Sequence, residues 1–285
     1  MAGKKTNHSL LKDKGFLPQK QDGFFSLRLR IAGGYVGTDE LRAIAGAADR
    51  YGDGHVHITS RQGFEIPFVR LENTDRIGIE LEEAGVLSGA AGKRVRAIVA
   101  CQGSEVCKRG LIDSQSISRR IDEMYFGADV PYKFKIAVTG CPSSCLRVQD
   151  NDFGIMGAVE PEWIRDKCFR CRLCAKTCKT DSITGEGGLV NFNRQNCMNC
   201  GDCISACFRD AIEAGSAGYT IYVGGKVGRN PRPGTKLVEL ADKETLFSIL
   251  DRTLEYYREN ALVDERLGDV LDRIGIEEFR EIVLG

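Results

Sequence analysis

The spacing of its cysteines constrains this chain more than any other feature of the sequence. Eight of the twelve cysteines form two runs of one pattern, C-x2-C-x2-C-x3-C. The runs are Cys168, Cys171, Cys174, Cys178 and then Cys197, Cys200, Cys203, Cys207. No apolar stretch near the N-terminus is long enough for a signal peptide, so we expect a reducing, cytoplasmic compartment. Such tight groups there indicate metal ligation rather than disulfide bonds.

Each run fits an iron–sulfur cluster better than a zinc ion. Structural zinc sites usually combine two well-separated C-x2-C pairs, whereas this pattern is typical of bacterial two-cluster ferredoxins. In those proteins the fourth cysteine of each run binds the other cluster. We therefore assign one cluster to Cys168, Cys171, Cys174 and Cys207, and the other to Cys197, Cys200, Cys203 and Cys178. The proline that usually follows each fourth cysteine is replaced by Lys179 and Phe208.

The remaining four cysteines form a second kind of group. Cys101 and Cys107 give C-x5-C, and Cys141 and Cys145 give C-x3-C. Each pair follows a segment with strand character, which would place the thiols on loops at strand ends. Four thiols placed in this way could bind one metal cluster.

Elsewhere the apolar residues alternate between strand and helix periodicity. The pattern predicts strands at 24–31, 55–59, 64–69, 94–100, 134–139 and 219–223, and helices at 38–50, 73–84, 113–126, 242–260 and from 276. The N-terminal order of strand, helix, strand, strand gives a sheet too small to be stable alone, so this lobe needs a partner. The polar, lysine-rich start of the chain is expected to be a solvated arm.

Four motifs occur together in the order found in one enzyme family. They are Leu27-Arg28-Leu29-Arg30 with Gly33-Gly34, then Ile58-Thr59-Ser60-Arg61-Gln62, then Lys133-Phe134-Lys135, and the two cysteine pairs. In these motifs the chain resembles the sirohaem-dependent sulfite and nitrite reductases. Its compact layout is most similar to the anaerobic and dissimilatory-type sulfite reductase subunits.

The resemblance implies an α+β fold of three units. Residues 1–72 would form a ferredoxin-like half-lobe, and residues 73–160 with 216–285 would form a domain that binds sirohaem and a 4Fe–4S cluster. Residues 161–215 would form an inserted ferredoxin domain with two further 4Fe–4S clusters. The expected cofactors are therefore sirohaem and three [4Fe–4S] clusters.

The resemblance also implies roles for individual residues. Sirohaem carries eight carboxylates, and arginine is suited to carboxylates because its planar fork donates two parallel hydrogen bonds. The residues expected to bind sirohaem are Arg28, Thr59, Arg61, Gln62, Arg94 and Cys145, the last of which would touch the iron. Those expected to bind the substrate anion are Arg30, Arg96, Lys133 and Lys135. Strand alternation places both lysines on one side, and each arginine pair on one face, but leaves open which arginine reaches the substrate.

Two functions fit these features. The first is a six-electron reduction of sulfite to sulfide or of nitrite to ammonia, with electrons entering through the inserted clusters. The alternative is an electron-transfer subunit without its own anion-reducing site, although such a protein has no need for the lysine and arginine set. We expect an external donor, either a ferredoxin or a flavin/NADH subunit, and a homo-oligomer or a paralogous hetero-oligomer. The net charge of zero argues against a nucleic-acid partner, and no apolar run is long enough to span a membrane.

Overall fold

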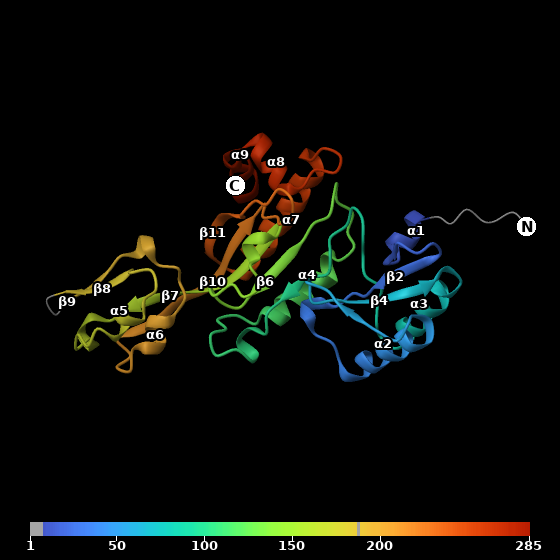
Figure 1. Ribbon diagram of the computed structural model, residues 1–285. Coiled ribbons are helices and arrows are strands. Elements are labelled where there is room, and N and C mark those ends of the chain that lie inside the picture. Colours follow the sequence, from blue (N-terminus) through green and yellow to red (C-terminus); the bar gives the residue numbers. More distant parts are fainter. Residues whose placement is uncertain (1–7, 187–188) are drawn as a thin grey trace, which may run out of the picture.

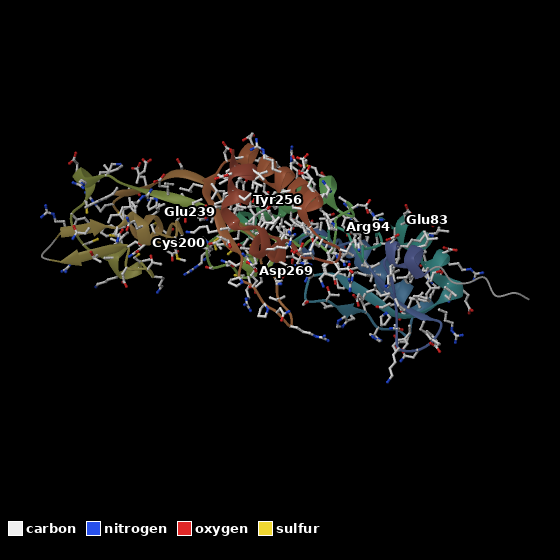
Figure 2. All side chains as sticks on the ribbon, turned by 90° about the horizontal axis from the view of Figure 1, so that it is seen from above. Glu83, Arg94, Cys200, Glu239, Tyr256 and Asp269 are labelled. Carbon is white, nitrogen blue, oxygen red and sulfur yellow. The ribbon has the colours of Figure 1, made fainter. Side chains whose placement is uncertain are left out.

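The computed structural model describes residues 8–186 and 189–285, and it places three regions in a row (Figure 1). The N-terminal lobe lies at one end, a mixed sheet with the C-terminal helices lies in the middle, and the cysteine-rich region lies at the other end. Seen from above, Glu83 of the N-terminal lobe and Cys200 of the cysteine-rich region lie toward opposite ends (Figure 2). Residues 1–7 of the expected solvated arm, 1–22, lie outside the described residues. For the rest of that segment the expectation is wrong, because His8–Asp13 is a helix and Phe16–Pro18 is a strand of the N-terminal sheet, with Phe16 only 2% exposed.

The N-terminal lobe is a four-stranded antiparallel sheet in the order β1-β2-β4-β3. Its elements are α1 (His8–Asp13), β1 (Phe16–Pro18), β2 (Phe24–Arg28), α2 (Thr38–Tyr51), β3 (His57–Ile58), β4 (Phe64–Arg70) and α3 (Thr74–Glu83). Leu27 and Ile66 from the sheet and Ile44 from α2 are at most 1 % exposed, so they form its core. Strand β2 ends at Arg28, three residues earlier than the sequence predicts, and Leu29 makes an isolated bridge to Ser88 instead.

Helix α3 belongs to this first core. Its Ile77 and Leu81 are almost fully buried in the same apolar cluster as Leu27 and Ile44. The domain boundary expected at residue 73 places α3 in the second unit. The structure shows that α3 packs in the first lobe, because the apolar face of the helix is buried by contact with the sheet and α2.

The central sheet has five strands in the order β11-β10-β7-β6-β5. Its strands are β5 (Val99–Ala100), β6 (Ile136–Thr139), β7 (Phe153–Trp163), β10 (Ile212–Val223) and β11 (Thr235–Ala241). Strands β5, β6 and β7 are parallel, whereas β10 is antiparallel to both β7 and β11. The strand expected at 94–100 is regular only in β5, because Arg94 and Val95 make isolated bridges to Asp129 and Phe134.

Helices cover one face of the central sheet. They are α4 (Ser114–Tyr125), α7 (Lys243–Asn260), α8 (Leu267–Ile274) and α9 (Ile276–Leu284), and α8 was not expected from the sequence. Side chains of alternate sheet positions, such as Ile136 and Val138, pack with α4 and α7 in the largest core. Helix α7 begins at Asp242, whose side chain accepts a hydrogen bond from the Thr245 backbone N–H. No helix in the described ranges is long and apolar enough to cross a membrane.

The cysteine-rich region lies between β7 and β10 in the sequence and extends from the end of this strand pair (Figure 1). It contains α5 (Leu173–Thr177), β8 (Ile183–Glu186), β9 (Leu189–Phe192) and α6 (Asp202–Ala206). The pairing of β7 and β10 extends from Phe153 with Val223 to Trp163 with Ile212. The glycine-rich segment at residue 215, expected to separate the insert from the next strand, is an irregularity within β10. The insert therefore continues directly from a long strand pair, which fixes its direction relative to the sheet.

A buried ion pair connects β7 to the C-terminal helices. Asp152 is fully buried at the start of β7, and both of its oxygens accept hydrogen bonds from Arg266, at 2.9 and 2.6 Å. The same carboxylate accepts the backbone N–H of Lys135 at 2.8 Å. Because this carboxylate receives three donors, it joins the segment before β6, the start of β7 and the start of α8.

We expect Arg266→Met to destabilise the protein by about 3–5 kcal/mol, because it leaves the Asp152 carboxylate buried without its cation. Urea unfolding measures this change. The matched control is Arg273→Met, at the other end of α8, where an exposed guanidinium pairs with Glu265 and its loss should change stability little. Equal stability of the two variants would contradict the importance of the buried pair.

Candidate functional site

The site begins with a cavity of about 290 Å³ between the N-terminal lobe and the central domain. It is lined by Arg28, Leu29, Thr59, Ser60, Arg61, Gly63, Gly89, Ala90, Arg96, Ala97, Lys133 and Lys135. Five of these residues are basic, and none of the lining residues in the described chain is acidic. Six of the residues predicted from the sequence to bind sirohaem or substrate thus meet in one place.

Each wall of the cavity comes from a different part of the chain. Arg28 ends β2, and Arg61 lies in the turn between β3 and β4. Lys133 and Lys135 stand on the extended segment that leads into β6, while Phe134 between them is fully buried in the central core. The alternation of this segment therefore directs both ammonium groups to the cavity, as the sequence predicts.

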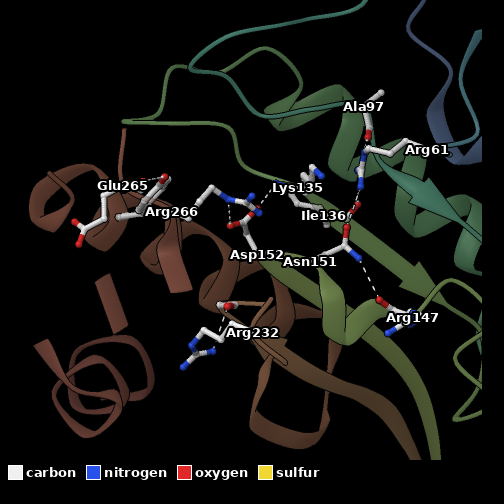
Figure 3. A network of polar contacts seen from close by, with 12 residues as sticks. Arg61, Ala97, Lys135, Ile136, Arg147, Asn151, Asp152, Arg232, Glu265 and Arg266 are labelled. Carbon is white, nitrogen blue, oxygen red and sulfur yellow. Dashed lines mark hydrogen bonds and ion pairs between the residues drawn. The ribbon is translucent and has the colours of Figure 1, made fainter. Parts of the chain in front are cut away.

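Two of the arginines are held by neutral oxygens rather than by carboxylates. Arg61 donates to the backbone carbonyls of Ala97 and Ile136 and to the side-chain oxygen of Asn151 (Figure 3). Arg96 donates to the carbonyls of Ala90 and Gly92. These contacts fix the orientation of both guanidinium groups but leave their positive charges uncompensated.

The third arginine, Arg28, is different because it has an acidic partner. Its guanidinium forms an ion pair with Glu65, at 2.6 Å from the nearest carboxylate oxygen. Glu65 lies on β4, opposite Arg28 in the pairing of β2 with β4. The cavity therefore has a fixed positive wall in which one cation of five is neutralised directly.

Burial, together with neighbouring cations, lowers the pKa values of three basic groups of the cavity. Burial is the main cause for Lys135, whose pKa falls to about 8, and the charges of Arg61, Arg266 and Lys133 lower it further. Burial also lowers the pKa of Arg61 and of Arg96 to about 10, and neighbouring arginines add to both effects. Figure 3 shows Lys135 beside the Asp152–Arg266 pair. A bound anion would reverse these shifts, so the cavity favours a ligand with several negative charges.

Arg30 and Arg94 lie outside the lining of this cavity. Arg30 forms an ion pair with Asp122 of α4 at 2.7 Å and stacks over Phe126. Arg94 pairs with Asp129 and donates to the Gly127 carbonyl. Of each arginine pair in the sequence, one member, Arg28 or Arg96, faces the cavity. The other is bound by a carboxylate from α4 or the loop after it.

Two further predicted residues shape the loops of the site. Gln62 adopts a left-handed backbone conformation, with φ of 58°, and its amide exchanges hydrogen bonds with both the N–H and the carbonyl of Ala100. Thr59 lines the cavity, and its hydroxyl accepts the backbone N–H groups of Arg61 and Gly63. Gln62 therefore links the cavity turn to the residue that precedes Cys101.

The loops that carry the first cysteine group meet at one edge of the central sheet. Strands β5 and β6 are parallel neighbours, so Cys101 after β5 and Cys141 after β6 emerge at the same edge. The Gly140 backbone N–H donates to the Cys101 sulfur at 3.0 Å, and Ser114 lies 3.4 Å from the same atom. Cys107 and Cys145 are exposed on these loops, and Cys145 is not among the lining residues of the cavity.

In the insert, the eight cysteines divide into the two crossed groups that the spacing predicts. Cys207 lines one cavity together with Cys168, Cys171 and Cys174. Cys178 lines another together with Cys197, Cys200 and Cys203. Burial raises the pKa of the Cys200 thiol, and charge on Cys197 and Cys178 raises it further. The fourth cysteine of each run thus lies with the first three of the other run.

No three Cys, His, Asp or Glu side chains in the described residues converge closely enough to bind a single metal ion. In a 4Fe–4S cluster each of the four thiolates binds a different iron atom, so its ligands need not converge in that way. The three cysteine groups are therefore suited to clusters by their number of soft ligands and by their shared cavities or loops.

A fourth cavity, of about 220 Å³, lies between the insert and the first cysteine group. It is lined by Arg109, Cys141, Pro142, Ser143, Lys179, Met198, Cys200 and Asp202. The insert is fixed here by a bridge of Val159 with Cys200 and by a hydrogen bond from the Val159 N–H to the Asn199 carbonyl. The group containing Cys200 is therefore the one that lies next to the central domain.

Comparison with known families decides the relationship. Residues 91–285 match the family described as the nitrite and sulphite reductase 4Fe-4S domain, and residues 17–84 match the nitrite/sulfite reductase ferredoxin-like half domain. The chain belongs to the nitrite and sulphite reductase family. It is thus an oxidoreductase of that family, with an α+β fold built from these two parts.

Several named relatives are sulfite reductases. The chain is 36% identical over 276 residues to the coenzyme F420-dependent sulfite reductase of Methanocaldococcus jannaschii, covering 95% of this chain and 44% of that protein. It is 30% identical over 178 residues to a subunit of the anaerobic sulfite reductase of Salmonella typhimurium, covering 58% and 52% of the two chains. The chain thus spans about half the length of these two relatives.

The crystal structure of dissimilatory sulfite reductase I has the same fold. It matches with a TM-score of 0.76 at 22% identity, over 91% of this chain and 69% of that chain. The structure of the Mycobacterium tuberculosis NirA protein matches with a TM-score of 0.71, over 98% of this chain and 46% of that chain. The fold of this reductase family is therefore present along nearly the whole chain.

The residues that sequence reasoning missed are those that hold the cationic wall. Asp152, Arg266 and Asn151 lie behind the cavity, and Glu65 beside it. The one available signal was Asp152, an acidic residue immediately before the apolar run of β7. A carboxylate at the start of a buried strand requires a donor partner, but the sequence does not indicate that the partner is more than a hundred residues away.

We expect Lys135→Met to stabilise the protein without bound cofactors at pH 7. The pKa of Lys135 is about 8 in the folded protein and 10.5 ordinarily, so the charged lysine is disfavoured on folding below pH 8. Between pH 8 and pH 10.5 Lys135 is neutral in the folded protein but still protonated in the unfolded chain. The free energy of unfolding of the wild type therefore rises with pH across this range, whereas that of the variant has no such contribution. Thermal unfolding at pH 7 and pH 10 should show the advantage of the variant shrinking, whereas exposed Lys20→Met should show no such trend. A variant less stable than wild type at pH 7 would contradict this.

Proposed function

We propose that this chain is a sirohaem-dependent reductase that carries out the six-electron reduction of sulfite to sulfide or of nitrite to ammonia. The observation that carries the proposal is the cavity with five cations. Gln62, in the turn between β3 and β4, donates a hydrogen bond to Ala100, the residue before Cys101, so this anion-binding cavity is tied to the first cysteine group. An electron carrier without an anion-reducing site would not need buried cations that destabilise its own fold.

The donor set of the cavity fits a ligand with many carboxylates. Arg28 and Arg61 would hold sirohaem carboxylates, with Thr59 and Gln62 keeping the turn between β3 and β4 in place, and Arg96 would reach the substrate anion. When bound, sirohaem supplies the iron that takes up the anion and passes electrons to it. Cys101, Cys107, Cys141 and Cys145 would hold the adjacent 4Fe–4S cluster.

Lys133 and Lys135 would bind the substrate anion and supply protons. Each oxygen that leaves the substrate departs as water, so protons must reach it while electrons arrive. Burial and neighbouring cations lower the pKa of Lys135 in the empty cavity, and a bound anion raises that pKa again, so the ammonium is charged when the substrate binds. Two ammonium groups on one side of an extended segment can therefore both hold the anion and protonate it.

Electrons would enter through the insert, residues 161–215, acting as a ferredoxin domain with two clusters. Of the group formed by Cys178, Cys197, Cys200 and Cys203, Cys200 lines a cavity together with Cys141, which belongs to the first cysteine group. A cluster there would pass electrons to the cluster of the central domain. The other insert group would then hold the outer cluster, making three in total.

We expect Lys133→Met and Lys135→Met to lower anion turnover by roughly 100-fold or more while iron, acid-labile sulfide and sirohaem contents stay unchanged. The change removes the charge and the proton but keeps most of the side-chain volume. The measurement is oxidation of reduced methyl viologen with sulfite and, separately, with nitrite, and the faster anion identifies the substrate. Lys20→Met is the matched control.

Wild-type turnover in both lysine variants would show that the anion binds elsewhere. A purified protein with three clusters and no sirohaem absorption bands would instead support the electron-transfer alternative. The two results are distinguishable, because the first is measured as turnover in the lysine variants and the second as the absorption spectrum of the wild-type protein.

The reductase would act as a homodimer or with a paralogous subunit. The short strand β3 forms an edge of the N-terminal sheet, and Ile58 on it is 70% exposed. An open edge with an exposed apolar residue can pair with a second half-lobe. Light scattering of the protein with its cofactors should give at least twice the monomer mass, and a stable monomer would refute the proposal.

A further inference from the structure

Two aromatic side chains are exposed together at the outer cysteine group of the insert. Phe169 and Phe208 are 55% and 63% exposed, and their rings meet edge to face with centroids 5.4 Å apart. Phe208 occupies the position where the two-cluster pattern usually has a proline, directly after Cys207. Both rings line the cavity of the outer cysteine group, yet each remains more than half exposed, so the pair presents an apolar surface to which another molecule can bind.

Basic residues surround the aromatic pair. The cavity of the outer group is lined by Arg170, Arg172 and Arg209, and by no acidic residue within the described chain. The Arg209 guanidinium lies 5.9 Å from the Phe169 ring centroid. Neither Arg170 nor Arg209 has a carboxylate partner among the residues that the structure describes. In a chain with no net charge, residues 164–173 and 205–210 carry five basic and two acidic residues.

This surface is also the part of the insert nearest to its outer cysteines. Cys171 is itself exposed, and it lies between the exposed residues Arg170 and Arg172. The inner group is the one that shares a cavity with the central domain. A redox centre docked on the surface formed by Phe169, Phe208, Arg170 and Arg209 would therefore meet the outer group first.

We propose that this surface, the aromatic–arginine face, is the docking site for a small acidic electron-carrier protein. The inference rests on the proposed function, because it requires clusters in the insert. The arginines would steer an acidic partner and orient it, while the phenylalanine pair would form the dry centre of the contact. Arginine and aromatic residues are the side chains most enriched at the centre of such interfaces.

A second copy of this chain is a poorer occupant of the same face. Two-fold pairing would bring two sets of basic residues against each other, and like charges in contact oppose association. An acidic carrier would instead be attracted to the basic residues of the face. The electron step needs no further reactant: the reduced carrier loses one electron and becomes oxidised, and the outer cluster gains that electron and becomes reduced.

The test is the rate at which a reduced acidic [2Fe–2S] ferredoxin passes electrons to the holoprotein, followed by stopped-flow absorbance. The double variant Arg170→Glu/Arg209→Glu reverses the charge of the face. The matched control is Lys20→Glu/Arg76→Glu, two exposed residues of the N-terminal lobe that give the same change in net charge. Dithionite reduction of the clusters, with iron content, serves as the internal reference.

At low ionic strength the face variant should lose on the order of tenfold in the second-order rate constant, and the loss should shrink as salt is added. The control should change little, and dithionite should reduce the clusters of both variants as in the wild type. Equal rates of electron transfer from ferredoxin to the two variants would overturn the proposal. A lower mass of the face variant alone, measured by light scattering, would also overturn it, because it would identify a second copy of the chain as the occupant of the face. Failure of the proposed function gives a different result, because the wild-type protein would then lack sirohaem absorption bands and anion turnover even where dithionite reduces its clusters.

Discussion

The buried carboxylate of Asp152 is the interaction on which the central part of this structure depends. It accepts two hydrogen bonds from Arg266 and one from the Lys135 backbone. It therefore joins the start of β7, the C-terminal helices and the segment that carries both cavity lysines. A fully buried carboxylate is tolerated only where its hydrogen-bonding capacity is met, so these three segments are held in one arrangement.

The same arrangement creates the positive wall of the cavity. Burial lowers the pKa of Lys135, the charges of Arg61 and Arg266 lower it further, and the nearby Asp152 carboxylate offsets only part of this fall. Arg61 and Arg96 are oriented by carbonyl and amide oxygens that carry no charge. A site of this kind lowers the stability of the empty protein and gains free energy when an anion binds, which is a common property of functional sites.

The long pair of strands β7 and β10 connects this cavity domain to the insert. Because the pairing extends from the central sheet to Trp163 and Ile212, with one irregularity between Ala214 and Ala217, the insert is placed by backbone hydrogen bonds rather than by a linker. The Val159 contacts then bring the group of Cys200 against the loop of Cys141. The order of the cysteine groups, from the exposed face inward, follows from this geometry.

The sequence by itself determined the crossed grouping of the insert cysteines, the family motifs and the direction of the two cavity lysines. The crossed grouping was implied by the pattern of two-cluster ferredoxins, and the motifs carried the family resemblance, whereas the common side of the two lysines follows from strand alternation within a short segment. Only the tertiary structure decided which arginine of each pair faces the cavity, because Asp122 and Asp129 bind Arg30 and Arg94 from other parts of the chain. It also assigned α3 to the first lobe and revealed the Asp152–Arg266 pair. Such choices depend on contacts between residues far apart in the sequence, and periodicity along one segment carries no information about them.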